Sequence, residues 1–238
     1  MAPKTTVEYL VVAPHPDDAE LGMGGTIAKL LGAGRRVAVV DLTSGEPTPF
    51  GTPAKRRRET AAATRVLGLK VRLNLGLPNR ALEATLAART RLAEVYRLLR
   101  PRVLFIPYWD DAHPDHLAAS QLAVHARFHA KLTKTRMKGE PHYPPRVLYY
   151  YCTHLRRHGD VAFVIDVSRE FETKRRAVAC YRSQFYSPGL RASGREAGAV
   201  MDYVADLNRY WGRLIGRAYG EPFAVREVLG LAGPEPIL

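Results

Sequence analysis

Short apolar runs alternate with longer helical segments through the first 106 residues of this 238-residue chain. The apolar runs predict strands at 7–14, 36–42, 71–75 and 103–106. Helical spacing of apolar residues predicts helices at 24–31, 54–67 and 86–99, which end near Gly32, Gly34, Gly68 and Pro101. This order is typical of right-handed βαβ units. The predicted fold class is therefore α/β, a Rossmann-like wound, mainly parallel sheet flanked by helices.

The pattern changes in the second half of the chain. Residues 131–145 contain Lys, Pro and Gly and are expected to form a loop. Two further strands are predicted at 147–151 and 163–167, followed by helices at about 169–182 and 199–218. The length suits one large α/β domain, so we expect a single domain over residues 1–238.

The two cysteines, Cys152 and Cys180, lie far apart and form no CxxC pair, so we expect reduced thiols and no disulfide framework. A chain of this length buries enough surface to fold without staples, so a bound metal would serve chemistry. The apolar run at 9–13 is too short for a signal-peptide core, and no stretch approaches the length of a membrane span. We expect a cytoplasmic protein with no membrane partner.

The formal net charge of +13 has three interpretations. The basic residues could bind nucleic acid, attract an anionic substrate to a cleft, or spread over the surface without a specific role. The densest basic run is Lys55 to Arg58, which Glu59 closes. A nucleic-acid-binding domain would leave the His and Asp clusters described next unexplained, so we expect no nucleic-acid partner.

Two His- and Asp-rich segments follow the first and fourth predicted strands: His15-Pro16-Asp17-Asp18 and Asp110-Asp111-Ala112-His113-Pro114-Asp115-His116. Ligands of wound sheets bind at the carboxyl ends of the strands, so both segments belong at one edge. Catalytic zinc takes three protein ligands from His and carboxylate, and hydrolysis also needs a carboxylate that does not bind the metal. Adjacent Asp17 and Asp18 suit this division, and His113 and His116 suit a ligand and a second imidazole. Gly22 to Gly25 lacks dinucleotide-binding spacing.

These segments resemble the signatures of a known family. The run from Pro14 to Gly22, continued by Gly24-Gly25-Thr26, resembles the opening signature of the LmbE-like (PIG-L) zinc deacetylases, and 113–116 resembles the second. Asp41 to Glu46 and the Arg57-x-Glu59 pair also fit. Within the family, similarity is greatest to the bacillithiol-pathway deacetylases, on the segments 22–29, 149–151, 163–168 and 174–185.

The resemblance implies a role for each site residue. His15, Asp18 and His116 would hold Zn²⁺, and Asp17 would be the general base. His113 would face the developing oxyanion while Asp115 holds its ring and raises its pKa. Glu46, Arg57 and Asn79 would line the sugar pocket. Because consecutive residues of a helix face different directions, we also expect Arg57 to point into the cleft and its neighbours to face solvent.

The same resemblance implies a substrate, the acetamide of N-acetyl-α-D-glucosaminyl L-malate, and a homo-oligomer. Two departures bear on it. Ala112 replaces an Arg that bacillithiol members often carry, and Val200 aligns with the family's mobile Tyr, with Tyr203 one turn away. An inositol-linked conjugate or a chito-oligosaccharide is the alternative substrate.

Overall fold

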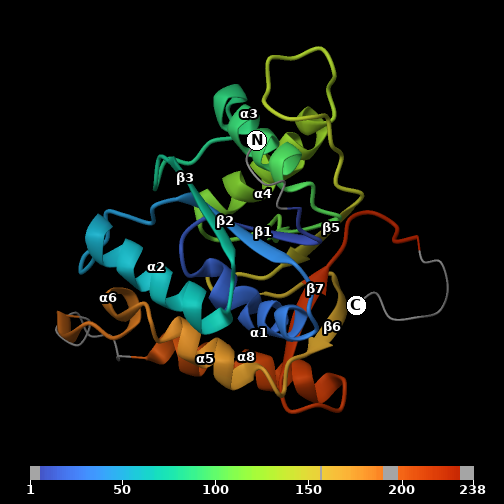
Figure 1. Ribbon diagram of the computed structural model, residues 1–238. Helices are drawn as coiled ribbons and strands as arrows, with labels where there is room; N and C mark the ends of the chain where they lie inside the picture. The colour runs from blue at the N-terminus through green and yellow to red at the C-terminus, as the bar shows by residue number, and fades with distance from the viewer. Residues whose placement is uncertain (1–5, 156, 190–197, 231–238) are drawn as a thin grey trace.

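The computed structural model describes residues 6–155, 157–189 and 198–230. They build a seven-stranded sheet in the order β3-β2-β1-β4-β5-β7-β6 (Figure 1). The strands are β1 (Tyr9–Ala13), β2 (Val37–Thr43), β3 (Val71–Leu77), β4 (Val103–Pro107), β5 (Arg146–Tyr150), β6 (Val161–Asp166) and β7 (Gly220–Ala224). Strands β1 to β5 pair in parallel, and β7 is antiparallel to both β5 and β6. The predicted fold class is confirmed, while the outer limits of the predicted domain lie outside the described residues.

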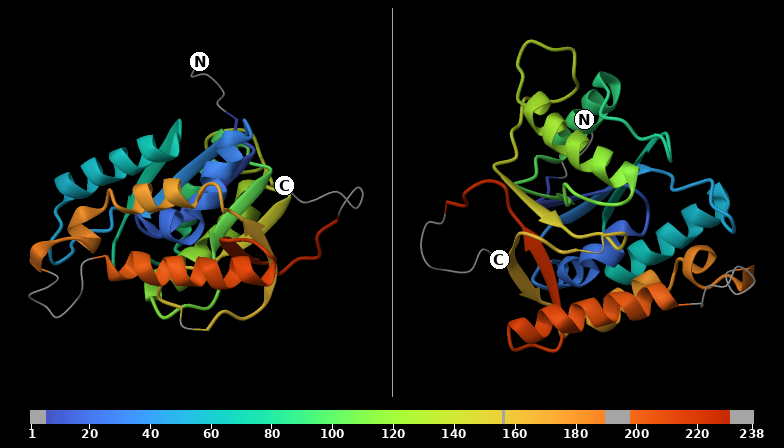
Figure 2. Two further views of the ribbon diagram at one scale, coloured as in Figure 1. Left: turned by 90° about the horizontal axis from the view of Figure 1, so that it is seen from below. Right: turned by 180° about the vertical axis from the view of Figure 1, so that it is seen from behind.

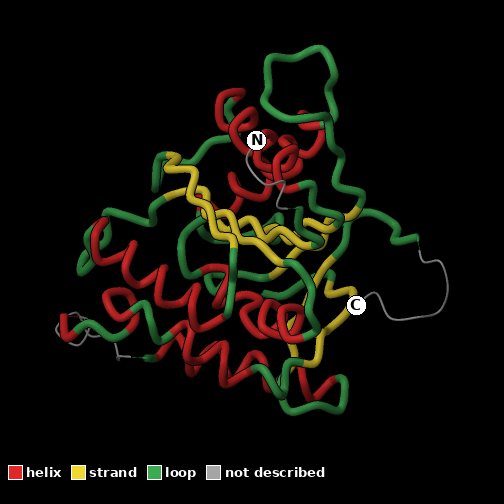
Figure 3. The backbone as a smooth tube through the Cα atoms, in the orientation of Figure 1, coloured by secondary structure: helices red, strands yellow, loops and turns green. Residues whose placement is uncertain are grey.

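Helices cover both faces of the sheet, as Figures 1 and 2 show. On one face lie α3 (Leu86–Leu99) and α4 (Pro114–Ala130), which pack against each other. On the other lie α1 (Asp18–Gly32), α2 (Pro53–Leu67), α5 (Phe171–Val178), α6 (Arg182–Phe185) and α8 (Ala199–Leu214). The sheet therefore separates two apolar cores, one under each layer of helices. Figure 3 shows the strands as one twisted central layer.

Helix α1 begins at Asp18, six residues before the predicted start at residue 24, but it is kinked at Met23, whose φ of −146° and ψ of 27° are not helical. The regular helix after this kink begins at the predicted residue 24. A Cβ on Gly22 would lie 2.5 Å from the Tyr150 ring, and one on Gly25 would lie 2.7 Å from Cβ of Val167. These glycines allow the helix to approach the sheet and the β6 side of the molecule closely. The short segment before the kink starts at Asp18, beside the end of β1.

Two elements do not follow from the sequence pattern. Helix α4 is not predicted because its first turn belongs to the second His/Asp segment, whose composition is typical of a loop. Strand β7, with the sequence GEPFA, contains Pro222, a residue that usually argues against a central strand. The predicted helix at 169–182 is also divided into α5 and the short α6, and α8 ends at Leu214 and not near 218.

Candidate functional site

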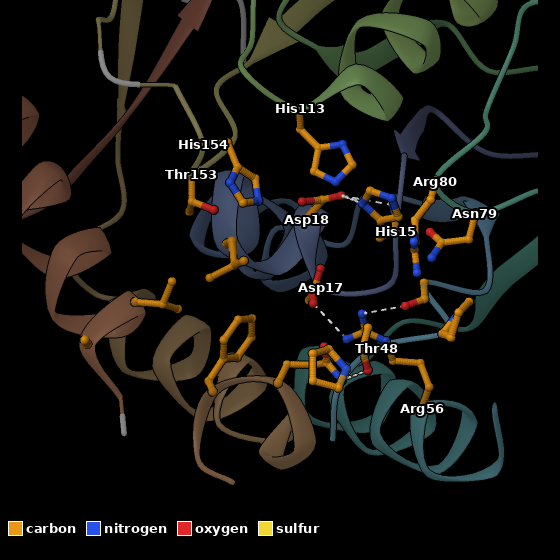
Figure 4. Close-up of a pocket in the computed structure, with 18 residues that line it drawn as sticks. His15, Asp17, Asp18, Thr48, Arg56, Asn79, Arg80, His113, Thr153 and His154 are labelled. Carbon is orange, nitrogen blue, oxygen red and sulfur yellow. Dashed lines mark hydrogen bonds and ion pairs between the residues drawn. The ribbon is translucent and has the colours of Figure 1, made fainter. Parts of the chain in front are cut away.

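A cleft of about 760 Å³ opens at the carboxyl ends of β1 to β5. Both predicted His/Asp segments reach it, together with loops after β2, β3 and β5 (Figure 4). Residues Gln184, Phe185, Ala199 and Val200 close the opposite wall. A cleft of this size and position is where α/β proteins bind small molecules.

His15, Asp18 and His116 form a buried group at the base of this cleft. Their potential ligand atoms lie within 4.8 Å of one another. His15 Nδ1 is 3.0 Å and His116 Nε2 is 3.3 Å from the same oxygen, Asp18 Oδ2. Two imidazoles and one carboxylate converging on a point are a donor set that suits zinc.

The outer nitrogens of both imidazoles are already held. His15 Nε2 lies 3.1 Å from Asp115 Oδ2, and His116 Nδ1 lies 3.1 Å from Asp111 Oδ2. Carboxylates in this position fix the tautomer and orientation of metal-binding histidines. The inner nitrogen of His116, Nε2, is buried without a hydrogen-bond partner among the described residues. A buried, unsatisfied nitrogen aimed at a second imidazole and a carboxylate fits a metal ion.

Two other groups have metal-compatible spacing, His15 with His113 and Asp115, and Asp111 with His116 and Cys152. Their carboxylates are engaged elsewhere: Asp115 accepts backbone N–H groups from residues 80 and 82, and Asp111 accepts one from residue 113. Burial raises the pKa of the Cys152 thiol to about 12, which disfavours the thiolate that a metal needs. We therefore assign the metal ion to His15, Asp18 and His116, and the other two groups supply residues that surround this site.

Asp17 stands beside the metal-binding group without being part of it. Its φ of 121° is a conformation that non-glycine residues rarely adopt, at a typical cost of ~1–3 kcal/mol. Its Oδ2 accepts a hydrogen bond of 2.8 Å from Arg56 Nη1. Burial raises the pKa of Asp17 to about 6, against the opposing effect of Arg56. The strained backbone thus directs into the cleft a carboxyl group with a pKa suited to accepting a proton near neutral pH.

The structure corrects the predicted pairing of His113 with Asp115. The Asp115 carboxylate contacts His15, whereas His113 Nδ1 accepts the backbone N–H of Asp115 at 3.1 Å. Burial, together with the neighbouring His116, lowers the pKa of His113 to about 4, opposite to the predicted direction. His113 is therefore a neutral imidazole whose proton lies on Nε2. It can still donate a hydrogen bond.

The prediction that Arg57 points into the cleft is wrong. Arg56 is buried and lines the cleft, while Arg57 is exposed. The buried residues of α2 are Arg56, Ala63 and Leu67, which share one face at helical spacing. That spacing is readable in the sequence, and it could have identified Arg56.

The other two predicted sugar-pocket residues lie near the cleft in different ways. Asn79 lines it, and its Oδ1 accepts a hydrogen bond from Thr43 Oγ1 at 3.2 Å. Glu46 is buried behind the lining, where it accepts hydrogen bonds from Thr48 and lies 3.7 Å from Arg56 Nε.

Sequence reasoning also missed residues that the structure brings to the site. Arg80 and His154 line the cleft, and the His154 ring centroid lies 5.3 Å from that of His113. His154 follows β5 at the same sheet edge, so the strand-end rule could have found it. Val200 lines the cleft as the alignment implied, while the Tyr203 hydroxyl donates to Leu155 O at 3.3 Å.

Comparisons with known proteins find similar deacetylases. The PIG-L family model, described as GlcNAc-PI de-N-acetylase, matches residues 10–127. The diacetylchitobiose deacetylase of Thermococcus kodakarensis is 29% identical over 242 residues, covering 94% of this chain and 84% of the relative. The chain belongs to the PIG-L (LmbE-like) deacetylase family.

Two solved structures are similar over nearly the whole chain. The conserved protein TT1542 of Thermus thermophilus superposes with a TM-score of 0.85 at 40% identity, covering 97% of this chain and 100% of that protein. The N,N'-diacetylchitobiose deacetylase of Pyrococcus horikoshii, complexed with its inhibitor MPG, gives a TM-score of 0.77 at 25% identity, covering 94% and 85%. None of the helices in the described ranges combines the length and apolar content needed to cross a membrane.

Proposed function

We propose that this protein is a zinc-dependent deacetylase that hydrolyses the acetamide of an N-acetylglucosamine conjugate, with N-acetyl-α-D-glucosaminyl L-malate as its substrate. The observation that carries the proposal is the group His15, Asp18 and His116, with the orphaned Nε2 of His116, beside a carboxyl group that binds no metal. The deacetylases from Thermococcus and Pyrococcus support the reaction class.

Zinc held by these three side chains would supply Lewis-acid activation of water and of the acetamide carbonyl. The Asp17 carboxylate would take a proton from the attacking water. Its Oδ2 is held by Arg56, whereas Oδ1 makes no hydrogen bond to any described residue and is the atom left to receive the proton. The same carboxyl group would then pass the proton to the departing amine, which leaves acetate and the free amino sugar.

His113 would donate from Nε2 to the oxygen that gains negative charge as water adds to the acetamide. The backbone N–H on Nδ1 fixes that tautomer, so no protonation step is required before the donation. A preformed donor of this kind is worth ~2.7–4 kcal/mol of barrier reduction.

The malate conjugate is supported by the similarity of segments 22–29 and 163–168 to bacillithiol-pathway enzymes and by the excess of positive charge. Diacetylchitobiose is the second candidate, because two relatives similar over 94% of this chain are named for it. Both would have the same reacting acetamide.

The test combines metal analysis with acetate release. Purified protein should hold about one zinc ion per chain and release acetate from the malate conjugate with a higher kcat/KM than from diacetylchitobiose or free N-acetylglucosamine. His15→Ala should lose zinc and activity together. Equal rates on all three substrates would remove the malate assignment, and full zinc occupancy in His15→Ala would refute the metal site.

A further inference from the structure

Two arginines line the cleft among the residues that the structure describes, and only one of them is neutralised. Arg56 is buried, donates to Asp17 Oδ2 at 2.8 Å and lies 3.7 Å from Glu46 Oε1. Its positive charge is therefore balanced by carboxylates of the protein itself. The exposed Arg80 makes no side-chain hydrogen bond or ion pair with any described residue. Its guanidinium group is a free cation on the cleft wall.

We propose that Arg80 binds a carboxylate on the aglycone of the substrate and so determines the preference for anionic conjugates. The inference rests on the proposed deacetylase function and assigns a specificity residue to it. Figure 4 shows Arg80 beside His15 and Asn79, across the cleft from Thr153 and His154.

The backbone of Arg80 is fixed relative to the metal-binding group. Its N–H donates to Asp115 Oδ2 at 2.7 Å, and the N–H of Leu82 donates to Asp115 Oδ1 at 3.2 Å. Asp115 Oδ2 also lies 3.1 Å from His15 Nε2. One carboxylate therefore joins the Arg80 loop to a predicted zinc ligand, and the φ of 65° at Arg80 is held by these bonds. The side chain thus starts from a fixed backbone position, so that only its own rotamers have to be ordered on binding.

The neighbours of Arg80 leave its charge available. Asn79, the preceding residue, is neutral, and its Oδ1 already accepts from Thr43 Oγ1. Because Arg56 is engaged with Asp17, Arg80 is the arginine left for an anion within the described cleft. A guanidinium group can bind a carboxylate through two parallel hydrogen bonds, and such charge-assisted contacts are strong.

The experiment compares Arg80→Ala, Arg80→Lys and wild type on the malate conjugate and on the uncharged methyl glycoside of N-acetylglucosamine. Arg80→Ala should lower kcat/KM for the malate conjugate by about 10- to 100-fold, mainly through KM, and change that for the methyl glycoside by less than about 3-fold. Arg80→Lys should retain part of the preference, because it keeps the charge and loses the paired geometry. Arg58→Ala removes one charge from the exposed surface of α2 and is the matched control.

The outcomes separate the two proposals. An equal loss on both substrates, or no loss on the malate conjugate, would overturn the role of Arg80 and leave the deacetylase standing. If the zinc-loaded wild type released acetate from neither compound, the proposed function would fall and the inference with it. Zinc content equal to that of wild type shows that the Arg80 variants keep an intact site.

Discussion

Asp17 and Asp18 are adjacent in the chain, yet their environments shift their pKa values in opposite directions. Burial raises both, but His116 and His15 outweigh it at Asp18 and hold that pKa well below its usual range. At Asp17 burial prevails over Arg56, and the pKa is about 6. The pair therefore separates into a permanently ionised carboxylate and one that can exchange a proton.

This separation gives different expectations for two isosteric variants. Asp17→Asn should keep its zinc and lose about 10²- to 10⁴-fold in kcat, because an amide cannot take the proton. Asp18→Asn should weaken zinc binding itself. Zinc titration with a competing chelator, followed by acetate release at saturating zinc, measures both quantities. Loss of zinc from Asp17→Asn with retention in Asp18→Asn would mean that the two roles are reversed.

Arg56 and Arg57 allow a second residue-scale test, since they differ in burial and not in charge. Arg56→Ala removes the partner of Asp17 Oδ2 and should lower kcat/KM by about 10- to 100-fold, the range of a charge-assisted hydrogen bond. Arg57→Ala, on the exposed side of α2, should stay within about 2-fold of wild type. Steady-state rates give kcat/KM for each variant, and the melting temperature shows whether the variant is folded. A larger loss of kcat/KM in Arg57→Ala than in Arg56→Ala would contradict the observed helix orientation.

Sequence reasoning could place both His/Asp segments at one edge of the sheet because each of them follows a predicted strand. The choice of His15, Asp18 and His116 among their side chains comes from the family resemblance. The partner of Asp115 could not be predicted in the same way, because it depends on the path of a loop that lies 33 to 35 residues earlier in the chain. The lowered pKa of His113 likewise arises from burial and from the imidazoles of His116, His15 and His154, which only the folded chain brings together.

At the scale of elements, the first four strands and the helices between them could be predicted because βαβ units repeat a simple pattern. Helix α3 has the predicted limits, and α2 ends at Leu67, capped by Gly68 with a φ of 79°. Strand β7 could not be predicted because a proline such as Pro222 argues against a central strand. In the folded sheet, β7 is nevertheless a central strand, flanked by β5 and β6.

The glycines of α1 provide an element-scale prediction. Gly25→Ala places a methyl group 2.7 Å from Val167 Cβ and should destabilise the protein by about 1–3 kcal/mol, through overpacking. Gly32→Ala, in the last turn of the same helix, meets nothing within 4 Å and should leave stability unchanged or slightly higher. Urea unfolding followed by circular dichroism compares them. Equal stabilities would show that the helix can move away from β6 without cost.

At the scale of the whole molecule, one buried ion pair joins four elements. Lys174 of α5 donates to Glu221 of β7 at 2.7 Å and to Asn208 of α8 at 2.9 Å. The Glu221 carboxylate also accepts the N–H groups of Gly25 and Thr26 in α1. Both charged side chains are fully buried.

Lys174→Met should therefore lower the free energy of unfolding by about 3–5 kcal/mol, because it leaves a buried carboxylate without its cation. The double variant Lys174→Met with Glu221→Gln should recover part of that loss. Arg175→Ala breaks an exposed pair with Glu172 on the same helix and should have no measurable effect. Chemical denaturation checks all three, and a Lys174→Met protein as stable as wild type would contradict the expectation. The predicted homo-oligomer and cytoplasmic location stay predictions.

The position of β7 between β5 and β6 has a consequence for the order in which the protein can fold during synthesis. Residues 161–166 are made more than fifty residues before 220–224, yet they pair with the sheet through that later strand. During this interval β6 has no neighbour in the described sheet, while β5 already lies beside β4 and exposes the edge that β7 will occupy. Unpaired strand edges are the usual route to intermolecular association. The edges of β5 and β6 that β7 covers in the finished sheet therefore stay open until residues 220–224 are made, and any delay in translation between residues 166 and 220 prolongs that exposure.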